Sequence, residues 1–169
     1  KRLGEFYSTT QKIELTDSNK KYTIAAKKFK DPKNLKWAFL NIWASAKKFE
    51  NTPDIRMCNE YKYLKMFKEM NFLTPKVIGL FLSDLILVMN YIEGVDLGTI
   101  SSEFLCGKSQ DLEPIRLYGY NLGRLHSKGY TLGDTKPSNA IYNNSKLYFT
   151  DLEQASEGGD YSWDIGEFI

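Results

Sequence analysis

The sequence predicts an α+β chain of two lobes, a small lobe made mostly of strands and a helical one. In the first third of the chain, runs of β-branched and aromatic residues give way to helix-forming segments. A break of turn-forming residues follows at Glu93-Gly94-Val95-Asp96. Beyond it, apolar residues recur every three or four positions across 115–125, the spacing of an amphipathic helix. We therefore expect an N-terminal lobe over residues 1–92 and a C-terminal lobe over residues 93–169.

The small lobe opens with two predicted strands, Lys12–Leu15 and Tyr22–Phe29. The residues between them, 17–19, are Asp, Ser and Asn, which supply turn chemistry. Residues 35–49 are rich in Ala and Lys and predict a helix.

A second predicted helix begins at Asp54, a favourable N-cap residue, and runs to about Met70. After Pro75 the segments Lys76–Phe81 and Leu85–Tyr91 are typical of two further strands. Glu60 lies beside one face of this helix, which is shared by Met57, Tyr61, Leu64 and Lys68.

In the helical lobe, the amphipathic helix should end at Gly129, because glycine is common just past helix C-termini. Two short strands are predicted next, Ala140–Tyr142 and Leu147–Thr150, with Asn143-Asn144 in the hairpin turn between them. A last helix is expected from Trp163 onward.

The composition is typical of a folded domain rather than of a nucleic-acid coat or a membrane-surface protein. The 169 residues are 42% apolar and 26% charged, and the formal net charge is only +2. Lysines crowd the first quarter, which we interpret as a solvated face rather than a polyanion site. No apolar run could span a membrane, and Cys58 and Cys106 lack zinc or disulfide spacing, so we expect a cytoplasmic location. Because the chain starts at Lys1 and stops at Ile169 inside a predicted helix, we expect both ends to be incomplete.

The most informative stretch is Asp134-Thr135-Lys136-Pro137-Ser138-Asn139, the pattern D-x-K-P-x-N. Asp151 follows twelve residues after Asn139, at the end of an apolar predicted strand. A loop that leaves a helix can present a carboxylate to an attacking hydroxyl. A second carboxylate and an amide oxygen can hold Mg²⁺, which prefers oxygen ligands. The hairpin should place Asn139 and Asp151 on neighbouring strand ends; the plain alternative is that Asp134 and Asn139 only cap turns.

This stretch resembles the catalytic and metal-binding loops of the protein-kinase superfamily. The resemblance implies a bilobal protein-kinase-like fold that binds ATP. It implies that Asp134 is the catalytic aspartate, which orients or deprotonates the acceptor hydroxyl, and that Lys136 contacts the transferred phosphate. It further implies that Asn139 and Asp151 are the ligands of Mg²⁺, with Mn²⁺ as an alternative ion.

Upstream segments follow in the order that the resemblance implies. Ile24-Ala25-Ala26-Lys27 resembles the strand whose lysine holds the α- and β-phosphates of the nucleotide. Lys28 is the rival, and because strand alternation sends neighbours to opposite faces, only one of the two can serve; we favour Lys27. Glu60, on the following helix, resembles the ion-pair partner of that lysine, although a single glutamate on a helix more often faces solvent.

The segment from Ile86 to Gly94 resembles the hinge between the two lobes. The resemblance implies that its backbone hydrogen-bonds the adenine of ATP, and that Met89 or its neighbour lies at the back of the pocket. A buried strand with its exit turn is a compatible interpretation. The hinge residues implied to bind the nucleotide are Met89, Asn90, Tyr91 and Ile92.

Two residues match supporting positions of the same family. His126, the only histidine, matches a structural position on the helix before the catalytic loop. Asp164 resembles an aspartate that bonds the backbone of the catalytic loop from a buried helix.

The sequence departs from typical protein kinases at three places. Leu132-Gly133-Asp134 stands in place of H-R-D, and the missing arginine indicates that no phosphorylated activation loop acts as a switch. Asp151-Leu152-Glu153 stands in place of D-F-G, and only twelve residues separate Asp151 from Asp164, so an extended activation segment cannot fit. No G-x-G-x-x-G pattern precedes the lysine strand, where only Gly4 could begin a phosphate-covering loop.

This shortened pattern resembles the RIO-type kinases and the KEOPS-complex kinase, with their archaeal and lipopolysaccharide-kinase-like relatives, over roughly residues 20–169. The implied fold is α+β and bilobal, a reduced protein-kinase-like fold without an extended activation segment. The implied function is that of a serine/threonine protein kinase that autophosphorylates. Three alternatives stay open: an ATPase switch subunit of a tRNA-modification-type complex, a small-molecule or sugar kinase, and a non-catalytic scaffold. The expected partners are ATP and a protein substrate or complex partner, with nucleic acid involved only indirectly.

Overall fold

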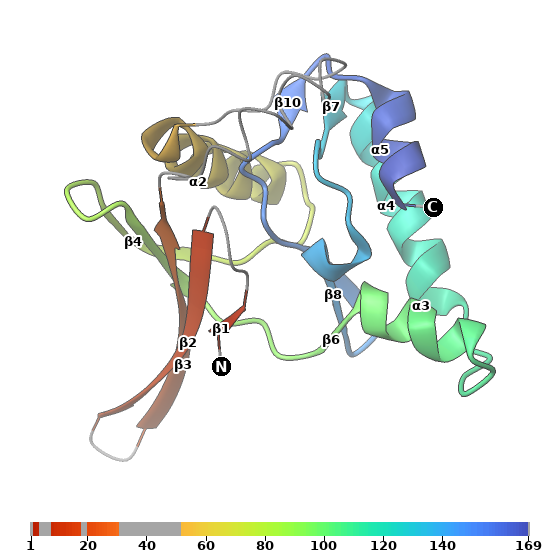
Figure 1. Ribbon diagram of the computed structural model, residues 1–169, viewed down its shortest axis with the longest axis horizontal. Coiled ribbons are helices and arrows are strands. Elements are labelled where there is room, and N and C mark those ends of the chain that lie inside the picture. Colours follow the sequence, from red (N-terminus) through yellow and green to blue (C-terminus); the bar gives the residue numbers. More distant parts are fainter. Residues whose placement is uncertain (1, 4–7, 18–19, 31–51, 169) are drawn as a thin grey trace, which may run out of the picture.

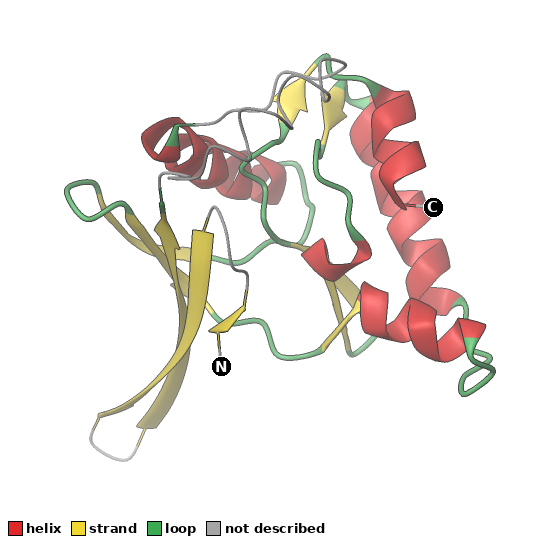
Figure 2. Cartoon of the chain, viewed as in Figure 1, coloured by secondary structure: helices red, strands yellow, loops and turns green. Residues whose placement is uncertain are grey.

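The computed structural model describes residues 2–3, 8–17, 20–30 and 52–168. Among these residues, one helix lies against an antiparallel sheet, and three helices pack beside short strands in the second half of the chain (Figure 1). Figure 2 shows the same division by type of secondary structure. Four features expected from the sequence lie outside the described residues: the helix over 35–49, the turn residues Ser18 and Asn19, and Gly4.

The sheet has five strands in the order β1-β2-β3-β5-β4, and every neighbouring pair is antiparallel. β2 (Ser8–Asp17) pairs with β3 (Lys20–Phe29) from end to end, so both strands are longer than the sequence predicts. This long pairing fixes which side chains of β3 face the interior, because neighbours on a strand point to opposite faces. The remaining strands are β1 (Arg2–Leu3), β4 (Val77–Phe81) and β5 (Ile86–Asn90).

The helix α2 (Pro53–Glu69) packs against the sheet, and the chain passes from its C-terminal end to β4 (Figure 1). The prediction that Asp54 is its N-cap is wrong: Thr52 takes that position with an extended backbone. Pro53 then starts the helix, which suits a residue without an N–H group. The face predicted to include Lys68 is also displaced, because Phe67 is buried and Lys68 is exposed. The residues that α2 buries are Arg56, Met57, Glu60, Tyr63, Leu64 and Phe67.

Three helices form the second half of the fold. α3 (Leu97–Leu105) was not predicted, because its Gly, Thr and Ser residues hide an apolar period. Asp96 caps it, since the carboxylate accepts a hydrogen bond from the Thr99 backbone N–H at 2.9 Å. α4 (Glu113–Ser127) confirms the amphipathic helix, and α5 (Tyr161–Phe168) begins two residues before the expected start.

Short strands position the loops between these helices. The hairpin turn is displaced by one residue from the prediction, because Asn143 pairs with Lys146 inside the ladder. Asn144 and Ser145 make the turn, both with left-handed φ values of 48° and 58°, as a two-residue hairpin requires. The strands are β6 (Val95–Asp96), β8 (Ala140–Asn143) and β9 (Lys146–Phe149) in one sheet, and β7 (Tyr130–Thr131) with β10 (Ser156–Glu157) in another.

Aromatic packing joins the two halves of the molecule. The Phe149 ring of β9 lies with its centroid 6.3 Å from that of Phe72, just after α2, and 5.8 Å from that of Tyr118 on α4. The Phe149 backbone N–H also donates to the Leu73 carbonyl at 2.9 Å. Because these contacts are buried, the loop that follows β9 is held close to α2.

Candidate active site

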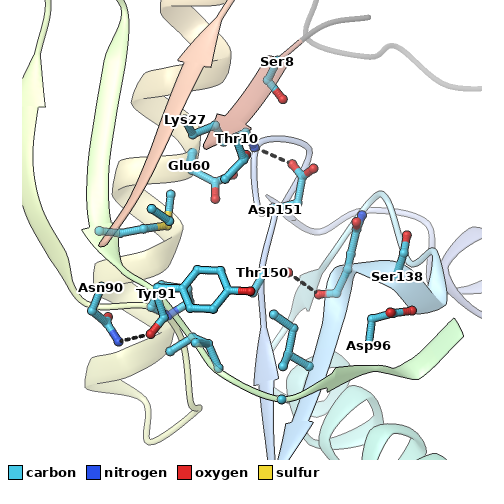
Figure 3. Close-up of a pocket in the computed structure, with 17 residues that line it drawn as sticks. Ser8, Thr10, Lys27, Glu60, Asn90, Tyr91, Asp96, Ser138, Thr150 and Asp151 are labelled. Atoms are coloured by element: carbon cyan, nitrogen blue, oxygen red, sulfur yellow. Dashed lines mark hydrogen bonds and ion pairs between the residues drawn. The ribbon is translucent and has the colours of Figure 1, made fainter. Parts of the chain in front are cut away.

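A cavity of about 440 Å³ lies between the sheet and the short strands of the second half (Figure 3). Side chains that the sequence leaves unassigned also line it, among them Ser8, Thr10 and Ser138. Two of the predicted site residues, Asp134 and Lys136, are not among the residues that line it. The other eight predicted residues do line it: Lys27, Glu60, Met89, Asn90, Tyr91, Ile92, Asn139 and Asp151.

Lys27 is the buried cation of this cavity. Alternation along β3 buries its side chain, which is 4% exposed, and leaves Lys28 exposed on the opposite face. The Lys27 Nζ lies 2.7 Å from a carboxylate oxygen of Asp151 and 3.3 Å from one of Glu60 (Figure 3). Of the two lysines that the sequence offers, only Lys27 meets the predicted glutamate.

Burial and charge act in opposite directions on this ion pair. Burial alone would lower the pKa of Lys27, but the facing carboxylates of Asp151, Glu60 and Glu153 outweigh it and raise that pKa. Burial raises the pKa of Glu60 to about 7, against the opposing effect of the Lys27 charge. Lys27 is therefore charged at neutral pH, whereas Glu60 titrates close to neutral pH.

Asp151 and Asn139 reach the cavity from neighbouring chain segments. Asn139 ends the short helix η1 (Pro137–Asn139), and its carbonyl accepts hydrogen bonds from the backbone N–H and the hydroxyl of Thr150, each at 2.9 Å. Asp151 follows with a left-handed φ of 57°, which turns its carboxylate toward Lys27. The two side chains therefore line one cavity, as the spacing of the motif predicts.

Asp134 is linked to Asn139 by a hydrogen bond within the same loop. Its carbonyl accepts a hydrogen bond from the Asn139 side-chain N–H₂ at 3.2 Å, and its carboxylate is 3.0 Å from the Lys136 ammonium. Burial raises the pKa of Asp134 against the lowering effect of Lys136, and the Asp151 charge raises it further. Asp134 and Asp151 thus act on one another electrostatically.

Asp164 accepts hydrogen bonds from the backbone of this loop, which confirms the role predicted for it from the sequence. One carboxylate oxygen of Asp164 accepts from the Leu132 N–H and the other from the Gly133 N–H, both at 2.8 Å. His126 Nε2 lies 2.9 Å from the same carboxylate, which gives His126 the structural position that the sequence suggested. Asp164 is fully buried, so these bonds are shielded from water.

Two charged residues of the site were not predicted. The Glu153 carboxylate lies 3.1 Å from the Lys27 Nζ and 3.2 Å from the Arg56 guanidinium, and both Glu153 and Arg56 are buried. The only signal in the sequence is that Glu153 occupies the place of the glycine in D-F-G. Nothing near Arg56 in the sequence indicates a partner so far along the chain.

The carboxylates of Glu60, Asp151 and Glu153 offer oxygen atoms within 4.8 Å of one another, a spacing that can hold a metal ion. The Lys27 Nζ, however, lies within 3.3 Å of all three carboxylates and supplies the positive charge there. The predicted pair, Asn139 and Asp151, lines the open cavity and offers an amide oxygen and a carboxylate, which suit Mg²⁺. The donor chemistry of the predicted pair therefore fits the ion.

The predicted hinge leaves β5 along one wall of the cavity. The Tyr91 backbone N–H donates to the Thr23 carbonyl of β3 at 3.2 Å. The Asn90 side chain is committed to the backbone, because its oxygen accepts from the Lys76 N–H and its N–H₂ donates to the Tyr91 carbonyl at 3.5 Å. These bonds fix the segment that is predicted to meet adenine.

Comparison with known proteins identifies the class of fold. The chain has an atypical protein-kinase-like fold of mixed α+β type, which confirms the fold-class prediction. The Rio2 kinase of Chaetomium thermophilum, solved as an ADP/Mg²⁺-phosphoaspartate complex, matches with a TM-score of 0.65 at 14% identity. That match covers 98% of this chain and 52% of the Rio2 chain. The bifunctional kinase-methyltransferase WbdD matches with a TM-score of 0.55 at 20% identity, over 81% of this chain and 30% of WbdD.

In sequence, the chain is similar to the KEOPS complex subunit Bud32 of Pyrococcus abyssi (strain GE5 / Orsay). The two are 32% identical over 97 residues, which are 57% of this chain and 43% of Bud32. The chain therefore spans less than half of that relative. No protein-family profile matches the chain. None of the described helices has the length and apolar content that a membrane crossing needs.

The tight contact at Gly133, in the loop that carries Asp134, predicts that Gly133→Ala is destabilising. Gly133 has φ of +78°, and an added Cβ would lie 2.1 Å from the Gln154 carbonyl oxygen. We expect a loss of about 2–4 kcal/mol in the free energy of unfolding, measured by urea titration. Gly119→Ala, at an open position of α4, is the matched control and should stabilise by about 0.5–1 kcal/mol. Equal effects of the two variants would contradict the assigned contact.

The raised pKa of Glu60 predicts how stability depends on pH. Its pKa rises from 4.5 to about 7 on folding, among Lys27, Asp151 and Glu153. Between these values the unfolded chain loses the proton and the folded chain keeps it, so rising pH favours unfolding. The stability of the wild type relative to Glu60→Gln should therefore fall between pH 5 and 7, by roughly 3 kcal/mol at most.

Urea titrations of the wild type and Glu60→Gln at each pH measure this difference, because groups remote from position 60 titrate equally in both proteins. Glu69→Gln, an exposed position on the same helix, controls for the removal of a negative charge from α2. A difference that rises with pH would show that Glu60 is ionised well below neutral pH.

Proposed function

We propose that this chain carries out ATP-dependent phosphoryl transfer, as the nucleotide-binding part of an atypical serine/threonine protein kinase that autophosphorylates. One observation carries the proposal. Lys27, Glu60, Asn139 and Asp151 come from four separate segments and line a single cavity. Its volume of about 440 Å³ is within the range of small-molecule sites.

The cavity offers distinct surfaces to the parts of a nucleotide. Ala25 and the hinge residues Met89, Tyr91 and Ile92 give one wall of the cavity an apolar surface, which suits adenine. Lys27 lies deeper, with its ammonium held by Glu60, and suits the α- and β-phosphates. Asn139 and Asp151 would hold Mg²⁺, which neutralises charge that develops on the transferred phosphoryl group.

Asp134 has the chemistry of the proton acceptor. As the acceptor hydroxyl oxygen forms its bond to the γ-phosphorus, the bond from that phosphorus to the bridging oxygen breaks and ADP leaves. The hydroxyl proton passes to the Asp134 carboxylate. The raised pKa of Asp134 makes it a better proton acceptor than an ordinary aspartate. The Lys136 ammonium lies 3.0 Å from that carboxylate and forms an ion pair with it. Lys136 would contact the transferred phosphoryl group.

An ATPase switch inside a larger assembly is the second candidate. It is supported by the similarity to Bud32, which is a subunit of the KEOPS complex. The short connection from Asp151 to Asp164 leaves no room for a peptide-docking activation segment, which is compatible with this candidate as well as with the kinases.

The two lysines of β3 give a matched test of nucleotide binding. Lys27→Met should lower ATP turnover about 100-fold or more, because the buried cation that meets the phosphates is lost. Lys28→Met removes the same charge from the exposed face of the same strand and should leave turnover unchanged. Labelled ATP with Mg²⁺ or Mn²⁺ measures both. Equal losses in the two variants would contradict the assignment of Lys27.

The fate of the labelled γ-phosphate separates the candidate functions. Label on the chain or on an added polypeptide supports the protein kinase, and free phosphate that rises with a partner supports the ATPase. Label on a metabolite would indicate a small-molecule kinase. Asp151→Asn should remove metal-dependent turnover and leave the chain folded by circular dichroism, because the side chain is 34% exposed. An absence of turnover in the wild type, unchanged by Asp134→Ala, would leave only the scaffold. Wild-type turnover in Asp151→Asn would contradict the assignment of Asp151 as a metal ligand.

A further inference from the structure

The loop after β9 carries a second carboxylate that the proposed chemistry does not use. Glu153 follows Asp151 by two residues, and its side chain is 10% exposed. Its two carboxylate oxygens face different cations: one is 3.1 Å from the Lys27 Nζ and the other is 3.2 Å from a guanidinium nitrogen of Arg56. Glu153 therefore bridges the nucleotide lysine and the first turn of α2.

Arg56 extends this bridge to a third segment. Its side chain is 1% exposed, and a second guanidinium nitrogen donates to the Lys30 carbonyl at the end of β3 at 2.6 Å. Asn59, one turn along the same helix, donates to the Glu153 backbone carbonyl at 3.4 Å. Arg56, Asn59 and Glu60 thus present one face of α2 to the loop, since residues three and four apart are neighbours on a helix.

The cluster contains fewer cationic groups than carboxylates, so its charges do not pair one to one. The cations Lys27 and Arg56 face three carboxylates, and all five groups are buried or half-buried. An apolar replacement of a buried ion pair is often no less stable than the pair itself, so stability alone does not require Arg56 and Glu153. When Asp151 is engaged with a cation, Glu60 and Glu153 still hold Lys27 from two sides.

We propose that Glu153 is a positioning residue, which together with Arg56 clamps α2 to the Asp151 loop and keeps Lys27 aligned without an external switch. The proposal rests on the proposed function and deepens it, because it assigns the regulation of that site. In this chain the clamp does the aligning that a phosphorylated activation segment would do elsewhere. The site is accordingly assembled whenever the chain is folded.

The test compares activity with stability in four variants. Glu153→Gln keeps the size of the side chain and should lower kcat about tenfold or more, with the KM for ATP changed less than about threefold. The double variant Arg56→Met with Glu153→Leu should regain the thermal midpoint lost in Arg56→Met alone, yet keep the low kcat. Glu157→Gln, exposed on β10, is the matched control and should leave kcat and the midpoint unchanged. A kcat that recovers together with the midpoint would overturn the clamp in favour of a purely structural pair.

Hydrogen exchange keeps the clamp testable apart from the proposed function. Glu153→Gln should speed exchange of the backbone amides in the first two turns of α2, relative to the wild type and Glu157→Gln. If the wild type turns over no ATP, the proposed function fails, and faster exchange in Glu153→Gln still supports the clamp. Unchanged exchange in that variant rules the clamp out, whatever the turnover.

Discussion

A buried ammonium group stays charged only where carboxylates surround it, and this constraint organises the molecule around Lys27. The strand β3 brings the lysine inward, α2 brings Glu60, and the loop after β9 brings Asp151 and Glu153. Because the carboxylates come from segments far apart in the chain, satisfying one cation draws the sheet, the helix and the loop together. Aromatic packing around Phe149 supports the same approach, since it holds β9 against the end of α2. The cavity exists because this ion cluster closes one end of it.

The same cluster explains why a nucleotide would need a metal ion here. Lys27 and Arg56 face the carboxylates of Glu60, Asp151 and Glu153, so both cations at the closed end of the cavity are already paired with acidic groups. A triphosphate that approached these groups without a cation would be repelled. Asn139 and Asp151 would hold a divalent ion here, and the ion would supply positive charge beside the phosphates. Asp151 is also the shortest contact of Lys27, at 2.7 Å. Under the proposed function, the Asp151 carboxylate is therefore shared between Lys27 and the metal ion.

The parts of the site that were predictable are those encoded locally. The motif from Asp134 to Asn139 fixes its own loop, and strand alternation predicts that only one of Lys27 and Lys28 can face the cavity. The parts that were not predicted depend on partners far along the chain, or on which of two neighbouring residues takes a cap or turn position. Glu153 and Arg56 lie 97 positions apart and acquire meaning only when α2 meets the loop. The displaced helix start reflects Pro53, which favours the first helical position and leaves Thr52 as the cap. The hairpin turn moved by one residue because Asn144 and Ser145 can both adopt a left-handed backbone, while Asn143 stays in the strand.

The glycine before Asp134 shows how this site is ordered without an activation segment. Gly133 lies so close to the Gln154 carbonyl that an added Cβ would come within 2.1 Å of it, so no arginine fits there in this conformation. The loop of Asp134 and the loop that follows Asp151 are therefore in direct backbone contact. Asp164 holds the first loop by two buried hydrogen bonds, and Arg56 holds the second through Glu153. Both loops are anchored to helices and contact one another, so their alignment depends on the folded core, as the proposed clamp requires.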